Sequence, residues 1–173
     1  LANYPNRDGR IANGVGYDTP ASTIAILRAM ENAGYRLENI PDNGNALIEV
    51  LHQGRTNAAS EKTSSATLTL FSYGIYYRAL PSELRKAMED RWGPPGDDPF
   101  VMDKQFHLPL QQFGNAVVGI QPARGYNIDP KATYHDPALV PPHGYLATYF
   151  WLRHVFGAHA VIHNGKHGNL EWL

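Results

Sequence analysis

The chain has 173 residues, of which 43% are hydrophobic and 18% charged, so we expect one globular domain over residues 1–173 and exclude a disordered chain. The formal net charge is −1 at pH 7 without a long run of lysine or arginine, so no nucleic-acid partner is expected. The sequence has no cysteine, which excludes disulfides and thiolate metal sites. It has no stretch long and apolar enough for a membrane span and no signal peptide, so we expect a cytoplasmic protein.

The first third of the sequence predicts a loop followed by two helices. Residues 1–18 are rich in glycine and asparagine and are expected to form a loop that follows the end of a strand. Thr19 and Pro20 predict a helix start, with Thr19 as the N-cap, and Gly34 predicts the end of this helix. A second helix is predicted over residues 42–54.

The remaining sequence predicts strands that alternate with helices. Residues 66–80 are ambiguous between strand and helix, whereas residues 81–93 predict a helix that starts at a proline and ends at a glycine. Residues 115–121 predict an apolar strand, residues 144–157 a helix, and residues 158–163 a short strand. This alternation predicts an α/β layered domain with a mainly parallel sheet flanked by helices.

Polar residues follow the predicted strands. In a parallel sheet, ligands bind beyond the carboxyl ends of the strands. Gln121 ends the strand over residues 115–121 and Arg124 follows it, and Lys166 and His167 follow the last strand. Six of the eight histidines also fall in the last 39 residues: His135, His143, His154, His159, His163 and His167. We therefore expect the functional residues of the chain at the edge of the sheet formed by the carboxyl ends of the predicted strands.

The stretch "HNGKHGNLE" spaces His163, His167 and Glu171 four residues apart. On a helix they would share one face, but Gly165 and Gly168 favour a strand followed by a loop. Imidazole and carboxylate ligands together suit a divalent transition metal. The residues alone leave an alternative open, in which His163 is a buried core histidine and the other two cap the loop.

Two glycines precede the first helix in "NGVGYDTPAS", where free amide groups could bind an anion. The phosphate-loop pattern Gly-x-x-x-x-Gly-Lys-Ser/Thr does not occur in the sequence. We therefore expect no nucleotide site in this chain.

Four blocks carry a family resemblance: "GVGYDTPAS", "GNAVVGIQPARGY", "YHDPALVPPHGYLATYFWLR" and "AVIHNGKHGNLEWL". They occur in the order found in the CobN/magnesium chelatase H family, and within it they resemble the large subunit of aerobic cobaltochelatase. The resemblance covers the whole chain. Tyr17 and Asn164 depart from the family pattern, which commonly has Leu at the first position and an aliphatic residue at the second. In the family the last block continues into Pro-Gly-Lys, so we expect this chain to be an internal part of a much larger subunit.

The resemblance implies a subunit that inserts Co²⁺ as substrate metal into hydrogenobyrinic acid a,c-diamide, on the way to cobalamin. It also implies that separate AAA-type ATPase subunits use the ATP. One alternative is the H protein of magnesium chelatase, which inserts Mg²⁺ into protoporphyrin IX. Another is a tetrapyrrole-binding module whose catalytic residues lie elsewhere in the larger subunit.

Roles for individual residues follow from this resemblance together with the chemistry of metal insertion. A carboxylate or a neutral imidazole can accept the macrocycle N–H protons and can hold the ion beforehand. We assign Glu171 and His167 as catalytic groups, and the metal ligands as His163, His167 and Glu171. The predicted substrate-binding residues are Arg124, Lys166, Gln121, His135 and His143.

Overall fold

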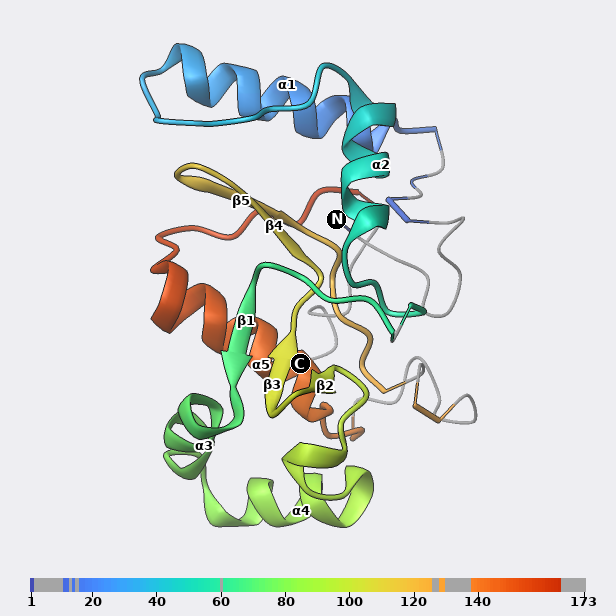
Figure 1. The fold of residues 1–173 in the computed structure, drawn as a ribbon, viewed down its shortest axis with the longest axis vertical. Helices are drawn as coiled ribbons and strands as arrows, with labels where there is room; N and C mark the ends of the chain where they lie inside the picture. Colours follow the sequence, from blue (N-terminus) through green and yellow to red (C-terminus); the bar gives the residue numbers. More distant parts are fainter. Residues whose placement is uncertain are drawn as a thin grey trace.

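The computed structural model of the chain describes residues 1, 11–12, 14, 16–59, 61–125, 128–129 and 138–165. Two helices at one end of the molecule, a hairpin and a small sheet in the middle, and two helices at the other end are arranged along its long axis (Figure 1). The elements are α1 (Thr19–Asn32), α2 (Gly44–Gln53), β1 (Thr67–Thr69), α3 (Leu70–Arg78), α4 (Ser82–Trp92), η2 (Pro95–Asp97), β2 (Val101–Met102), β3 (Gln105–His107), β4 (Leu110–Phe113), β5 (Ala116–Gly119), α5 (His143–Phe150) and η3 (Trp151–Phe156).

The strands of the described residues pair in an antiparallel way. One sheet has the order β1-β3-β2, and β4 and β5 form a separate hairpin. Asp103 and Lys104 connect β2 to β3 with φ angles of 51° and 63°. Positive φ angles at both residues are typical of a two-residue hairpin turn, and such a turn joins antiparallel strands. The expected mixture of helices and strands is confirmed, but the mainly parallel sheet is not found among these strands.

Leu1 shows the hydrogen-bond pattern of a parallel pair. Its backbone nitrogen donates to the Gly119 carbonyl at 2.6 Å, and the Gln121 N–H donates to the Leu1 carbonyl at 2.8 Å. Leu1 thus bonds to the residues on either side of Ile120. In parallel pairing a residue makes both of its hydrogen bonds in this way, so Leu1 and Ile120 form a parallel pair. The end of a strand expected at Leu1 therefore lies along the edge of β5.

Two hydrophobic clusters form the core. One lies between the β4–β5 hairpin and helices α1 and α2, where Leu27 and Leu47 are buried. The other lies between the three-stranded sheet and helices α3, α4 and α5. Tyr73 and Tyr77 of α3 are buried in this second cluster, whereas Tyr76 stacks on the His154 ring with centroids 4.2 Å apart. Three tyrosines of one short helix thus face two directions.

Three of the predicted elements differ from the structure in their start, type or existence. The N-cap of α1 is Asp18 rather than Thr19, because the Asp18 carboxylate accepts the Ala21 N–H at 2.9 Å. The helix predicted over residues 144–157 is α5 followed by the π-helix η3, and the left-handed Gly157 ends it. Residues 158–163 form no strand.

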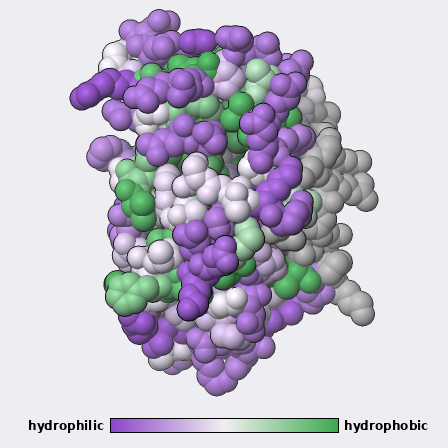
Figure 2. Space-filling view, viewed as in Figure 1, coloured by the Kyte–Doolittle hydropathy of each residue, from purple (hydrophilic) through white to green (hydrophobic). Residues whose placement is uncertain are grey.

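Several large apolar side chains are exposed among the described residues. Figure 2 shows apolar surface over η3 and α3 along one side of the molecule, where Phe71 is 76% exposed. Val161 and Ile162 are also exposed, and they belong to the walls of the hollows described below. No helix in the described part of the chain is both long enough and apolar enough to cross a membrane.

Candidate functional site

Two of the predicted site residues lie on one hollow beside β5. The hollow has a volume of about 100 Å³ and is lined by β5 and the residues after it, by α5 and η3, and by the segment over residues 161–163. Gln121 and His163 both line this hollow, together with Leu1 and Tyr149. Most of the wall is apolar, and its few polar groups, which include those of Gln121, Tyr149 and His163, could orient a polar ligand.

Gln121 is held by two residues that the sequence did not indicate. Its side-chain nitrogen donates to the Tyr149 hydroxyl at 3.5 Å, and its backbone carbonyl accepts the Asn57 side-chain N–H at 3.0 Å. The Asn57 side-chain oxygen accepts the Ala123 N–H at 3.0 Å. Asn57 therefore braces the turn after β5 from a position 64 residues away. Only the three-dimensional arrangement reveals this contact.

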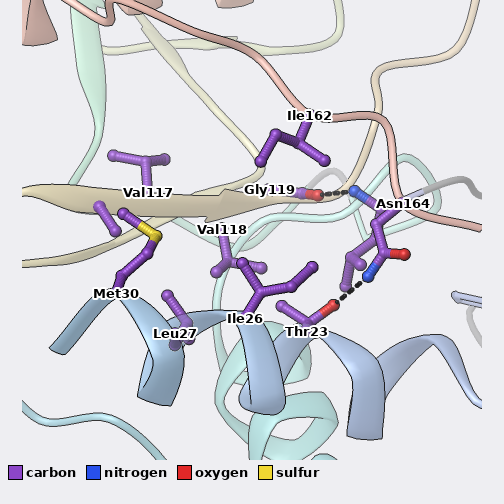
Figure 3. Close-up of a pocket in the computed structure, with 11 residues that line it drawn as sticks. Thr23, Ile26, Leu27, Met30, Val117, Val118, Gly119, Ile162 and Asn164 are labelled. Atoms are coloured by element: carbon purple, nitrogen blue, oxygen red, sulfur yellow. Dashed lines mark hydrogen bonds between the residues drawn. The ribbon is translucent and has the colours of Figure 1, made fainter. Parts of the chain in front are cut away.

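His163 is exposed at the end of the segment over residues 161–163. The alternative interpretation of His163 as a buried core histidine is therefore wrong. Its neighbour Asn164 lines a second hollow of about 160 Å³ between α1 and β5. Figure 3 shows the Asn164 side chain reaching Thr23 of α1, with a hydrogen bond of 2.8 Å between them.

Arg124 is buried and is not among the residues that line the hollow. Its side chain is 6% exposed, and its guanidinium donates to the Leu139 carbonyl at 2.8 Å. This bond ties the turn after β5 to the segment that leads into α5. The role of Arg124 as a partner for substrate carboxylates stays a prediction.

His143 is the first residue of α5 and is completely buried. Its Nδ1 lies 2.8 Å from the Tyr73 hydroxyl, and its Nε2 lies 3.0 Å from the Gly93 carbonyl oxygen. A carbonyl oxygen only accepts, so Nε2 carries the proton, and Nδ1 of the neutral ring accepts from Tyr73. Burial lowers the pKa of His143, which favours this neutral form. Because both ring nitrogens are used within the core, we leave His143 out of the site that we propose below.

We expect His143 to make the stability of the chain depend on pH. A buried histidine with a lowered pKa stabilises the fold above the ordinary pKa of about 6.5, and this contribution is lost as the pH falls. His143→Gln keeps a neutral donor and acceptor without the titration. In urea unfolding between pH 7 and 5, the free energy of unfolding should fall more steeply with decreasing pH for the wild type than for His143→Gln. The difference in slope should be up to about 1.4 kcal/mol per pH unit. Equal slopes in the two proteins would contradict this role.

The other predicted site residues, His135, Lys166, His167 and Glu171, lie outside the residues that the structure describes. Within the described residues, no three His, Asp or Glu side chains converge in a way that could hold a metal ion. The proposed ligand set therefore depends on the residues after Gly165.

Comparisons with known proteins identify the family to which this chain belongs. The sequence profile described as CobN/Magnesium Chelatase matches residues 1–173, so the chain belongs to the CobN/magnesium chelatase family. It is similar to the aerobic cobaltochelatase subunit CobN of Sinorhizobium sp, with 55% identity over 100% of this chain and 14% of the relative. The same subunit of Pseudomonas aeruginosa is 51% identical, with the same coverage of both chains.

More distant relatives and a solved structure agree with this family. The H protein of the magnesium chelatase of Chlorobaculum parvum is 29% identical over 98% of this chain and 13% of that relative. The catalytic subunit of cobaltochelatase from Mycobacterium tuberculosis has a similar structure, with a TM-score of 0.79 and 42% identity. The match covers 95% of this chain and 15% of that chain. The chain thus spans about 14% of the curated cobaltochelatase relatives that it matches.

Proposed function

We propose that the chain is part of the macrocycle- and metal-binding subunit of an ATP-dependent cobaltochelatase. This enzyme inserts Co²⁺ into hydrogenobyrinic acid a,c-diamide in cobalamin biosynthesis, as a cytoplasmic ligase that forms nitrogen–metal bonds. The observation that carries the proposal is the difference in identity over the whole chain. The chain is 55% and 51% identical to cobaltochelatase subunits, against 29% for a magnesium-chelatase protein.

The reaction requires that the macrocycle lose its pyrrole-type N–H protons as the ion arrives. His163, His167 and Glu171 hold the incoming Co²⁺ beforehand, and Glu171 and His167 accept these protons as the ion passes from them to the macrocycle. The exposure of His163 and its position on the same hollow as Gln121 support this assignment. Gln121 orients a polar arm of the macrocycle, and Lys166, Arg124 and His135 pair with its carboxylates.

ATP is hydrolysed by separate AAA-type subunits rather than by this chain. The missing phosphate-loop pattern supports this division of labour.

Reconstitution of the full-length subunit with its ATPase partners tests the proposed function. With ATP present, we expect the complex to insert Co²⁺ into the corrin precursor, and to insert no Mg²⁺ into protoporphyrin IX. Omission of the ATPase subunits should abolish insertion. Insertion of Mg²⁺ into protoporphyrin in place of cobalt insertion would favour the magnesium alternative. Macrocycle binding by a subunit that inserts neither metal would favour a binding module.

A further inference from the structure

Strand β5 directs part of its backbone away from the β4–β5 hairpin. In a strand, the N–H and C=O groups of successive residues point to opposite edges. The Ile120 N–H points toward β4 and donates to the Pro109 carbonyl at 2.9 Å. The backbone groups of Val117 and Gly119 therefore point to the other edge of β5. At this edge the Gly119 carbonyl accepts the Leu1 nitrogen at 2.6 Å.

Leu1 fixes both the direction and the register of a strand along this edge, because it forms a parallel pair with Ile120. A strand that continues in this register places the residue two positions before Leu1 opposite Val118. The N–H of that residue reaches the Val117 carbonyl, and its carbonyl reaches the Gly119 N–H. Parallel geometry thus supplies partners for the backbone groups that point to this edge.

The surroundings of the Leu1 nitrogen suit a peptide bond. This nitrogen is buried, and burial lowers the pKa of the Leu1 α-amino group to about 6. The site therefore favours a neutral N–H donor over a charged ammonium group. A peptide N–H within a strand is such a donor, and it makes the same hydrogen bond to Gly119.

The hollow of about 160 Å³ between α1 and β5 lies along the same edge. Ile26, Leu27 and Met30 line it from α1, and Val118 lines it from β5. Figure 3 shows these α1 side chains directed toward β5. Side chains of residues that pair across a sheet lie on the same face. A residue opposite Val118 therefore directs its side chain into this hollow, whose mostly apolar wall fits an apolar side chain.

We propose that β5 receives a parallel strand formed by the residues that precede Leu1 in the larger subunit. This inference uses one part of the proposed function, namely that the chain belongs to a larger subunit, and the chain spans about 14% of its cobaltochelatase relatives. Leu1 commits the edge to these residues rather than to a second copy, because it holds the register. The strand fills the hollow and makes β5 the middle strand of a mixed sheet, which fixes the end of β5 next to Gln121.

Hydrogen exchange of the full-length subunit, measured at single amides without metal, macrocycle or ATP, tests the added strand without any substitution. The Gly119 N–H should exchange at least about 10²-fold more slowly than an unprotected amide. The Ile120 N–H is the internal control, because it is bonded to Pro109 within the hairpin. A protected Ile120 beside an unprotected Gly119 would refute the proposal.

A cysteine cross-link identifies the occupant of the edge. The 173 residues contain no cysteine, and cysteines elsewhere in the subunit are replaced first. Val118→Cys is combined with a cysteine two positions before Leu1. In the proposed register the two Cα atoms are about 5 Å apart, so mild oxidation should form a disulfide within one subunit. Gln111→Cys is the matched control, since Gln111 pairs with Val118 from β4 and lies too far away for a disulfide.

The outcomes separate this inference from the proposed function. A disulfide between two copies of the subunit would assign the edge to a second copy and refute the proposal. No disulfide with Val118→Cys, in a subunit that melts like the wild type, would also refute it. If the cysteine pair does not fold, the exchange of Gly119 decides. Neither measurement depends on cobalt insertion, so a folded subunit that inserts no cobalt refutes the proposed function alone.

Discussion

Glu171→Gln in the full-length subunit is expected to lower the rate of cobalt insertion by about 10²–10⁴-fold, the range of general-base contributions. The change keeps the size and the hydrogen-bonding reach of the side chain but removes the base and its negative charge. Macrocycle binding should stay close to wild type, because we assign that role to other residues, namely Gln121, Lys166, Arg124 and His135. Insertion assays at saturating macrocycle, beside equilibrium binding, measure the two effects separately.

Glu38→Gln provides the matched control for this prediction, because Glu38 is an exposed glutamate in the segment between α1 and α2. It should insert cobalt at the wild-type rate. A Glu171→Gln variant that also inserts cobalt normally, with all partner subunits present, would remove Glu171 from the chemistry. Loss of macrocycle binding in that variant would point to a structural role instead.

Asp98→Ala is expected to lower the free energy of unfolding by about 2–5 kcal/mol, because it leaves two buried N–H groups without an acceptor. The Asp98 side chain is 6% exposed and accepts the Phe100 N–H at 2.9 Å and the Gly144 N–H at 2.7 Å. Gly144 lies in the first turn of α5, where a negative charge is favourable. Burial raises the pKa of Asp98, and its hydrogen bonds to these two backbone N–H groups act in the opposite direction.

Urea unfolding of the chain measures this effect, and Asp90→Ala is its control. Asp90 forms an ion pair with Lys86 in which both side chains are more than 60% exposed, at 63% and 75%. Asp90→Ala should lower the free energy of unfolding by no more than about 0.5 kcal/mol. Similar losses for the two variants would show that Asp98 does not hold α5 in place.

The local chemistry of the sequence predicted several helices well. The prolines and glycines around residues 81–93 bracket α4, which spans Ser82–Trp92. The second helix, predicted over residues 42–54, is α2 over Gly44–Gln53, and the Asn43 side chain caps it by accepting the Ala46 N–H at 3.0 Å. These signals act over three or four residues, so they can be read from sequence alone.

The arrangement of strands could not be predicted in this way. Alternating helices and strands favoured a parallel sheet, but the turn Asp103–Lys104 pairs β2 with β3 as an antiparallel hairpin. Neither residue is glycine or asparagine, so the usual signal of such a turn was missing. The parallel pattern occurs at Leu1, where it involves Ile120, more than one hundred residues away.

The candidate site was predictable in part. The position of Gln121 at the end of a predicted apolar strand indicated its place near the end of β5, and it lines the same hollow as His163. The contacts of Asn57, Tyr149 and Asn164 depend on long-range packing that no local pattern encodes. His143 was predicted to be a substrate-binding residue, but it is buried and its ring nitrogens contact the Tyr73 hydroxyl and the Gly93 carbonyl.

A structure of the full-length subunit with the corrin precursor and Co²⁺ bound, with the metal located by anomalous scattering at the cobalt edge, tests the central claim most directly. We predict that cobalt is bonded to His163, His167 or Glu171, with the macrocycle against the edge that carries Gln121. Cobalt bonded to the protein elsewhere, with none of these three residues among its ligands, would contradict the proposed site.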